Sequence, residues 1–205
     1  MPYKATKQLV SNRGIPPDSF LDELVAWGKT ASDDIFIPSL AQDVYSSVFN
    51  VMGPWQGPNH RRAVMLEVMR VLAGFESSWT WNQGVDKDKK EPDIPLTREA
   101  GAWQVSANSM GWGPELRNLV VTKAGADDPE TFQQAMKQNH ALAMEYIARL
   151  MRRTVETNGP VVRHEIDPWL RKDAVAEFLQ LLFPLGPSRG RAMDDSCVPQ
   201  FGRRW

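Results

Sequence analysis

Helix start signals built on proline recur along this 205-residue chain and constrain its fold more than any other feature. Pro16-Pro17 precede Asp18, and Asp128-Pro129 and Asp167-Pro168 each place an acid directly before a proline. Aspartate accepts hydrogen bonds from the free N–H groups of a first helical turn, and proline is well suited to the first helical position because no N–H is needed there. We therefore expect a chain built from helices.

Apolar residues recur at helical spacing along most of the sequence. They predict helices from Asp18 to just before Gly28, over residues 39–50 and 59–75, from 129 to about 156, and from 167 to just before Pro184. Residues 77–100 show neither helical nor strand periodicity, although a short hairpin within residues 80–105 stays open. The predicted fold class is mainly α, with a cleft and at most a small β-hairpin.

Length and charge limit the domain organisation and the partners. A chain of 205 residues is long enough for one buried core, so we expect a single domain over residues 1–205. The 24 basic and 25 acidic side chains nearly cancel, which removes the electrostatic signature of a dedicated nucleic-acid binder. We expect no nucleic-acid partner, and nothing in the sequence indicates more than a monomer.

The cysteine content and the apolar segments indicate where the chain is made. Cys197 is the only cysteine, so no intramolecular disulfide can form. A fold that needs no disulfide is compatible with the reducing cytoplasm. Residues 1–10 lack the apolar stretch of a secretory signal, and no segment approaches the roughly 20 apolar residues that span a bilayer. We expect synthesis in the cytoplasm without a signal peptide and without a membrane span.

Tryptophans are concentrated in one part of the sequence. The chain has eight, and five lie between positions 55 and 112: Trp55, Trp79, Trp81, Trp103 and Trp112. Core packing is the simpler explanation for each of them singly. A cluster beside a polar loop is also typical of sugar-binding clefts, because pyranose faces stack on indole. The clustering favours a cleft.

Two short stretches could carry chemistry. Glu76 follows an apolar helix and has aromatic neighbours, and such surroundings favour the protonated carboxyl that a general acid needs. The alternative is an ordinary acid at a helix end. In the segment 100–105, small residues allow close backbone approach and Gln104 offers both a donor and an acceptor. The alternative there is a tight turn before a short buried strand.

Together the two stretches resemble the lysozyme-like superfamily, especially goose-type lysozymes and soluble lytic transglycosylases. In these enzymes a helix ends in Glu-Ser and is followed, past a loop, by Gly-x-x-Gln, which Glu76-Ser77 and Gly101–Gln104 match here. Residues 139–147 look like the family's Asn-x-x-x-Gly-x-x-Tyr-Leu helix, with Ala143 in place of the glycine. The resemblance covers about residues 60–155 and leaves 1–50 outside. It implies a catalytic core over 59–183 and a tail over 184–205.

The resemblance implies a lysozyme-like helical domain with an active-site cleft. It also implies a muramidase activity, which cleaves the β-1,4 bond between N-acetylmuramic acid and N-acetylglucosamine in peptidoglycan. Glu76 would be the catalytic acid. The residues expected to bind the substrate are Ser77, Trp103, Gln104, Tyr146 and Asp93.

The second carboxylate is the main open point. Ser106 stands where goose-type lysozymes place an acid after the Gly-x-x-Gln segment. Asp86 is the best candidate, because goose-type enzymes carry an acid about ten residues past the catalytic Glu, and Asp93 is the alternative. An inverting hydrolase needs such a base, whereas a lytic transglycosylase uses the substrate's own 6-hydroxyl. If no loop acid enters the cleft, transglycosylation is the better interpretation.

Other classes of function stay open as well. The chain could be a lysozyme-like module that binds glycan or protein without catalysis, or a helical interaction protein for which the motif matches are chance. No metal site or other cofactor is predicted, because Lys90 interrupts the calcium-loop pattern that starts at Asp86 and Asp88. The alternative is an irregular oxygen site for calcium that uses Asp86, Asp88, Glu91 or Asp93.

The substrate lies outside the cytoplasm, which constrains how such an enzyme would reach it. Without a signal peptide, the expectation is phage-type release or delivery by a type VI secretion machine. In the second case the enzyme would be an antibacterial effector acting in the periplasm of a target cell. Its producer would make a periplasmic immunity protein that blocks the cleft.

Overall fold

The computed structural model describes residues 3–39, 42–84 and 94–184. This part of the chain is mainly helical with one small antiparallel hairpin, as predicted. The longer helices are α1 (Asp18–Thr30), α4 (Pro58–Ser77), α5 (Pro114–Ala124), α6 (Pro129–Gln138), α7 (His140–Arg153) and α9 (Lys172–Leu182). The short ones are α2 (Val44–Ser47), α3 (Phe49–Met52) and α8 (Gly159–Val162), with 3-10 turns η1 (Asp33–Phe36), η2 (Pro95–Thr97), η3 (Ala107–Trp112) and η4 (Asp167–Trp169).

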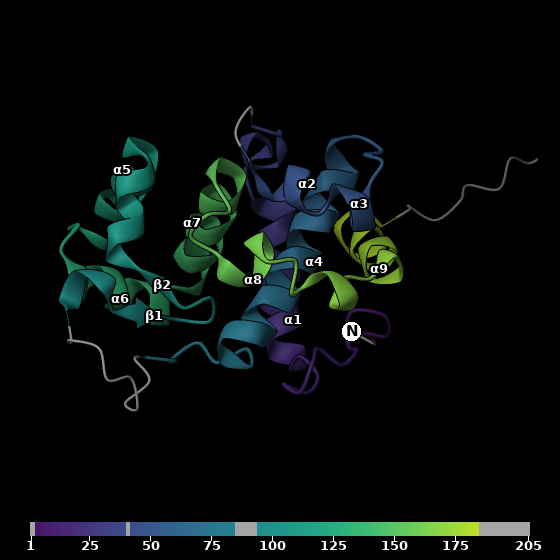
Figure 1. Cartoon of the computed structure of the whole chain (residues 1–205), viewed down its shortest axis with the longest axis horizontal. Helices are drawn as coiled ribbons and strands as arrows, with labels where there is room; N and C mark the ends of the chain where they lie inside the picture. The colour runs from purple at the N-terminus through teal and green to yellow at the C-terminus, as the bar shows by residue number, and fades with distance from the viewer. Residues whose placement is uncertain (1–2, 40–41, 85–93, 185–205) are drawn as a thin grey trace, which may run out of the picture.

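The hairpin consists of β1 (Glu99–Ala100) and β2 (Val105–Ser106), in which Glu99 pairs with Ser106 and Ala100 with Val105. It packs on α6 at one end of the molecule, together with α5 and η3 (Figure 1). Helices α1, α4 and α9 pack on one another at the other end, and α7 contacts both groups. One hydrophobic cluster, from Tyr3 to Leu182, includes residues of both groups.

Helix α4 lies at the centre of this arrangement. It contacts α1, α7, α8, α9 and η1, and it is buried around most of its circumference. Two of its fully buried residues are charged: the guanidinium of Arg70 donates two 2.7 Å hydrogen bonds to the carboxylate of Glu67. The main-chain N–H of Arg171 adds a third, at 3.0 Å. Burial raises the pKa of Glu67, and Arg70 opposes that shift.

Two predicted helix boundaries are wrong near the N-terminus. Helix α1 continues through Gly28 to Thr30, because Gly28 is a packing position and not a stop. A Cβ added there would lie 2.7 Å from the side chain of Leu66 in α4. The helix expected over 39–50 begins only after Asp43, whose carboxylate accepts a hydrogen bond from the Ser46 N–H, and it is split into α2 and α3.

Two boundaries are also wrong in the second half of the chain. The long helix expected from 129 to about 156 is divided at Asn139, whose side-chain oxygen accepts from the Leu142 N–H and caps α7. The start signal at Asp167 produces the 3-10 turn η4, and α9 begins only at Lys172. The predicted end of the last helix, before Pro184, is confirmed.

No helix within residues 3–39, 42–84 and 94–184 is long and apolar enough to cross a membrane.

Candidate functional site

Glu76 lies in the last turn of α4, where its side chain is half-buried. The unpaired carbonyl groups of a helix C-terminus carry partial negative charge, which disfavours an ionised carboxylate nearby. The chain leaves the helix through Ser78 and Trp79, both in the left-handed region with φ of 52° and 61°. Glu76 therefore sits at the end of a rigid, buried helix and directly before a sharp change of direction.

Ser77 joins the end of α4 to the hairpin. Its hydroxyl donates to the carbonyl oxygen of Ala102 at 2.8 Å, within the turn between β1 and β2. The Ser77 hydroxyl oxygen also accepts a hydrogen bond from the N–H of Thr80, at 3.0 Å. Ser77 is only 8% exposed, so these bonds are shielded from water. The structure thus brings together the two stretches that the sequence singled out, Glu76-Ser77 and Gly101–Gln104.

The hairpin turn depends on Gly101 and Gln104. Gly101 has φ of +76°, and a Cβ there would lie 2.5 Å from the main-chain oxygen of Met136 in α6. The Gln104 side-chain amide donates to the carbonyl oxygens of Gly101 at 2.8 Å and Gln83 at 3.4 Å. Gly101 N–H donates to the same Gln83 oxygen at 2.9 Å. The half-buried Gln104 side chain therefore shapes the turn and holds the segment after Glu76 against it.

Trp103 and Tyr146, which were predicted to bind the substrate, are buried like Ser77. Trp103 is 2% exposed, and its indole N–H donates to the carbonyl oxygen of Met69 in α4 at 2.9 Å. Tyr146 is fully buried, its hydroxyl lies 2.6 Å from that of Ser109, and its ring packs edge-on against Phe132. Burial raises the pKa of the Tyr146 hydroxyl. Side chains buried in this way can act on a bound glycan only through their neighbours.

Arg163, which follows α8, is a residue that the sequence did not indicate and whose charge interacts with that of Glu76. Its guanidinium pairs with Glu165 at 2.7 Å, and this hydrogen bond, with a further contribution from the charge of Glu76, raises the pKa of Arg163. The side chain is 61% exposed, so it can meet a ligand. The only local signal was the turn-forming Asn158-Gly159-Pro160 shortly before it.

Asp86 and Asp93, the candidates for the second carboxylate, lie outside the described residues, as does the proposed calcium segment 86–93. Among the described residues, no group of three or more His, Cys, Asp or Glu side chains is arranged to hold a metal ion.

The five clustered tryptophans differ in exposure. Trp79 and Trp103 are buried, Trp55 and Trp81 are half-buried, and Trp112 is 40% exposed. One face of Trp81 is covered by the ring of His140, which stacks on it at 3.9 Å. Core packing therefore accounts for most of the cluster, and Trp112 is the one with the largest exposed fraction.

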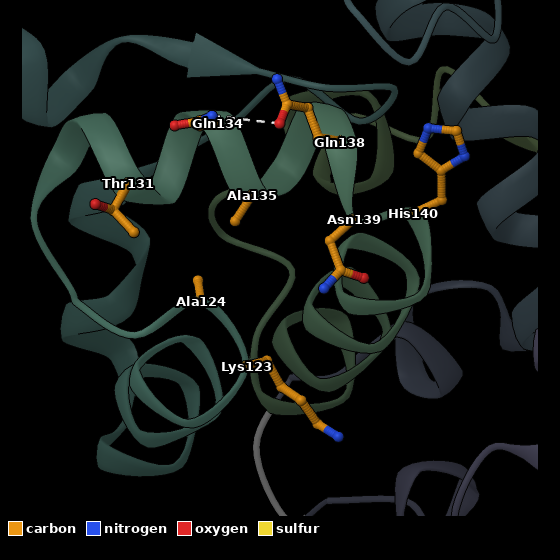
Figure 2. Close-up of a pocket in the computed structure, with 8 residues that line it drawn as sticks. All are labelled: Lys123, Ala124, Thr131, Gln134, Ala135, Gln138, Asn139 and His140. Atoms are coloured by element: carbon orange, nitrogen blue, oxygen red, sulfur yellow. Dashed lines mark hydrogen bonds between the residues drawn. The ribbon is translucent and has the colours of Figure 1, made fainter.

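A groove of about 690 Å³ lies between α5, α6 and α7 (Figure 2). Most of the residues that line it are polar, and none of them was predicted to form the site. The lining consists of Lys123, Ala124, Thr131, Gln134, Ala135, Gln138, Asn139 and His140. Gln134 and Gln138 are hydrogen bonded to each other along α6, at 3.3 Å. The groove is therefore separate from the group of residues around Glu76.

No family model matches the chain, and no curated protein or solved structure matches it either. The arrangement of the described residues must therefore be judged by its own chemistry. It offers a half-buried carboxyl at a helix end, a hairpin turn hydrogen bonded to the next residue, and an exposed guanidinium whose charge interacts with that of the carboxyl. Such a set can donate a proton and bind a polar or anionic ligand.

Proposed function

We propose that this chain is a muramidase that cleaves the β-1,4 bond between N-acetylmuramic acid and N-acetylglucosamine in peptidoglycan. The observation that supports the proposal most is the 2.8 Å hydrogen bond from Ser77 to Ala102. It joins the Glu-Ser end of α4 to the Gly-x-x-Gln turn, two motifs separated by more than twenty residues of sequence. Contact between two motifs so far apart in sequence supports their belonging to one site.

Glu76 acts as the general acid in this proposal. Cleavage of a glycosidic bond requires a proton for the departing sugar oxygen, and a carboxyl that stays protonated near neutral pH supplies it. Glu76 is half-buried at the C-terminal end of a 20-residue helix, and both features are typical of carboxyls that act as general acids. Arg163 acts against this role, since a cation that interacts with the carboxyl favours the carboxylate.

Asp86 is the proposed water-activating carboxylate, with Asp93 as the alternative. An inverting mechanism would place it about 6.5–9.5 Å from the Glu76 carboxyl, leaving room for a water molecule. Without that second acid, the product would be the anhydro end of a lytic transglycosylase. The chemistry of the released ends therefore distinguishes the two reactions.

The test is mass spectrometry of the fragments released from purified peptidoglycan. Wild-type protein should release fragments with reducing muramic ends, and Glu76→Gln should release none while keeping the wild-type circular dichroism spectrum. Glu145→Gln is a matched control, because it removes another half-buried helical glutamate, paired with Arg149 at 2.9 Å. It should cleave like wild type.

Three outcomes would change the assignment. Anhydro ends would indicate a transglycosylase acting through Glu76. Full cleavage by Glu76→Gln would refute the catalytic role. Binding to peptidoglycan without any released fragment would indicate a non-catalytic glycan-binding module.

We also propose that the enzyme acts in the periplasm of a target cell after secretion, and that an immunity protein blocks its cleft. Expression in a Gram-negative host tests the first point. Fusion to a periplasmic export signal should lyse the host, whereas the same chain kept in the cytoplasm should not. Lysis by an exported Glu76→Gln variant would argue against cell-wall cleavage as its cause.

A further inference from the structure

Two consecutive residues after the proposed catalytic end of α4 have an unusual backbone conformation. Ser78 and Trp79 both lie in the left-handed region. This region is uncommon for any residue with a side chain and is an outlier for a bulky one. Such conformations persist only where the surroundings determine them, and they concentrate at functional sites.

The side chain of Trp79 supplies those surroundings. It turns back along α4, is 5% exposed, and donates its indole N–H to the carbonyl oxygen of Arg70 at 2.8 Å. The main-chain N–H groups of Ser78 and Trp79 donate to the carbonyls of Gly74 and Ala73, each at 3.1 Å. The two left-handed residues are thus hydrogen bonded to the last turns of α4 through both main chain and side chain.

Gly74 makes room for the indole. A Cβ at this position would lie 2.7 Å from Cζ2 of Trp79. Glycine inside a helix is destabilising relative to alanine, so the presence of Gly74 in the second half of α4 indicates a packing requirement. Contact with the Trp79 ring is that requirement.

We propose that Trp79 is a positioning residue for Glu76. Two hydrogen bonds hold the end of α4. The Trp79 indole N–H donates to the main-chain carbonyl of Arg70, and the Ser77 hydroxyl donates to that of Ala102. Glu76 directly precedes Ser77, so these two contacts fix the main chain from which its carboxyl projects. This inference rests on the proposed function, because it concerns the same acid.

The experiment compares kcat and KM on solubilised peptidoglycan for Trp79→Phe and Gly74→Ala. Trp79→Phe keeps an aromatic ring but loses the N–H donor, and Gly74→Ala displaces the ring. Both should lower kcat by about tenfold or more with KM within about twofold, since small misplacement of a reacting group costs rate and not binding. Both should also move the pH profile of kcat, because the surroundings of the acid change.

Trp27→Phe is the control. Trp27 is a buried tryptophan of α1 that packs against Phe36. The control variant should lose stability but keep kcat and its pH profile. A kcat loss in Trp79→Phe no larger than in Trp27→Phe would overturn the positioning role, as would an unchanged pH profile.

A second measurement separates this inference from the proposed function. Backbone amide NMR signals of Glu76, Ser77 and Ser78 should shift in Trp79→Phe, while those of the distant α5 should not. If the wild-type chain cleaves no peptidoglycan, the proposed function fails but these shifts still report the geometry. If the signals stay in place, Trp79 does not position Glu76, whatever the activity.

Discussion

The buried ion pair of Glu67 and Arg70 should make the stability of the protein more sensitive to the loss of one charge than to the loss of both. Glu67→Gln keeps the volume of the side chain but leaves the guanidinium of Arg70, which is 0% exposed, without a counter-charge. Breaking one side of a buried pair costs about 3–5 kcal/mol. At about 2–4 °C per kcal/mol for a chain of this size, the melting temperature should fall by roughly 6–20 °C. Urea unfolding followed by tryptophan fluorescence measures the free energy directly.

The double variant Glu67→Leu/Arg70→Met should be less damaging than Glu67→Gln. It removes both charges and leaves only main-chain groups unsatisfied: the N–H of Arg171 and the carbonyls of Gln8 and Trp169. We expect a total cost of about 1–3 kcal/mol, because only the Arg171 N–H loses a hydrogen bond of ordinary length, whereas both contacts to the carbonyls are 3.4 Å long. A single variant that loses under about 1 kcal/mol, or a double variant as unstable as the single one, would refute the reasoning.

Three further predictions concern the site and the acid limit of stability. Gly101→Ala should lower the free energy of unfolding by about 1–3 kcal/mol, because a side chain at this position is strained by the positive φ and clashes with the main chain of α6. A urea midpoint equal to that of wild type would contradict this. Arg163→Ala should move the alkaline limb of the kcat profile to higher pH, since a cation whose charge interacts with Glu76 is lost; a limb at the same or lower pH would refute this electrostatic effect. The pKa of Asp34 is lowered by its hydrogen bond with Ser32 and by an arginine of α7, so its contribution to stability is present above about pH 4 and is lost as the pH falls further. Melting temperatures between pH 3 and 6 should therefore fall less steeply for Asp34→Asn than for wild type.

The fold class was predictable from the sequence, whereas the helix junctions were not. Periodic apolar residues mark α4 and α7 because each must bury a face. The same periodicity continues through Asn139, since α6 and α7 both face the core, and nothing in the pattern shows that this asparagine caps a new helix. Gly28 shows the converse: a glycine typical of a helix end is instead required for close packing against Leu66.

The candidate site was predictable only in part. The resemblance paired Glu76-Ser77 with Gly101–Gln104, and the structure places the two stretches together through one hydrogen bond. Tyr146 was expected to contact the substrate, but its position on α7 turns it into the core. The charge of Arg163 interacts with that of Glu76 although almost ninety residues separate them in the chain, and no local pattern indicates this interaction.

The central position of α4 also sets the order in which the chain can acquire its final structure. Helix α9 packs along α4 although the two are separated by about a hundred residues of sequence. Contacts between such distant segments slow folding, because a long loop must close before they form. During synthesis, the helix that carries Glu76 cannot be fully enclosed until the ribosome has released Leu182. The packing around α4 is therefore completed only after α9 has docked.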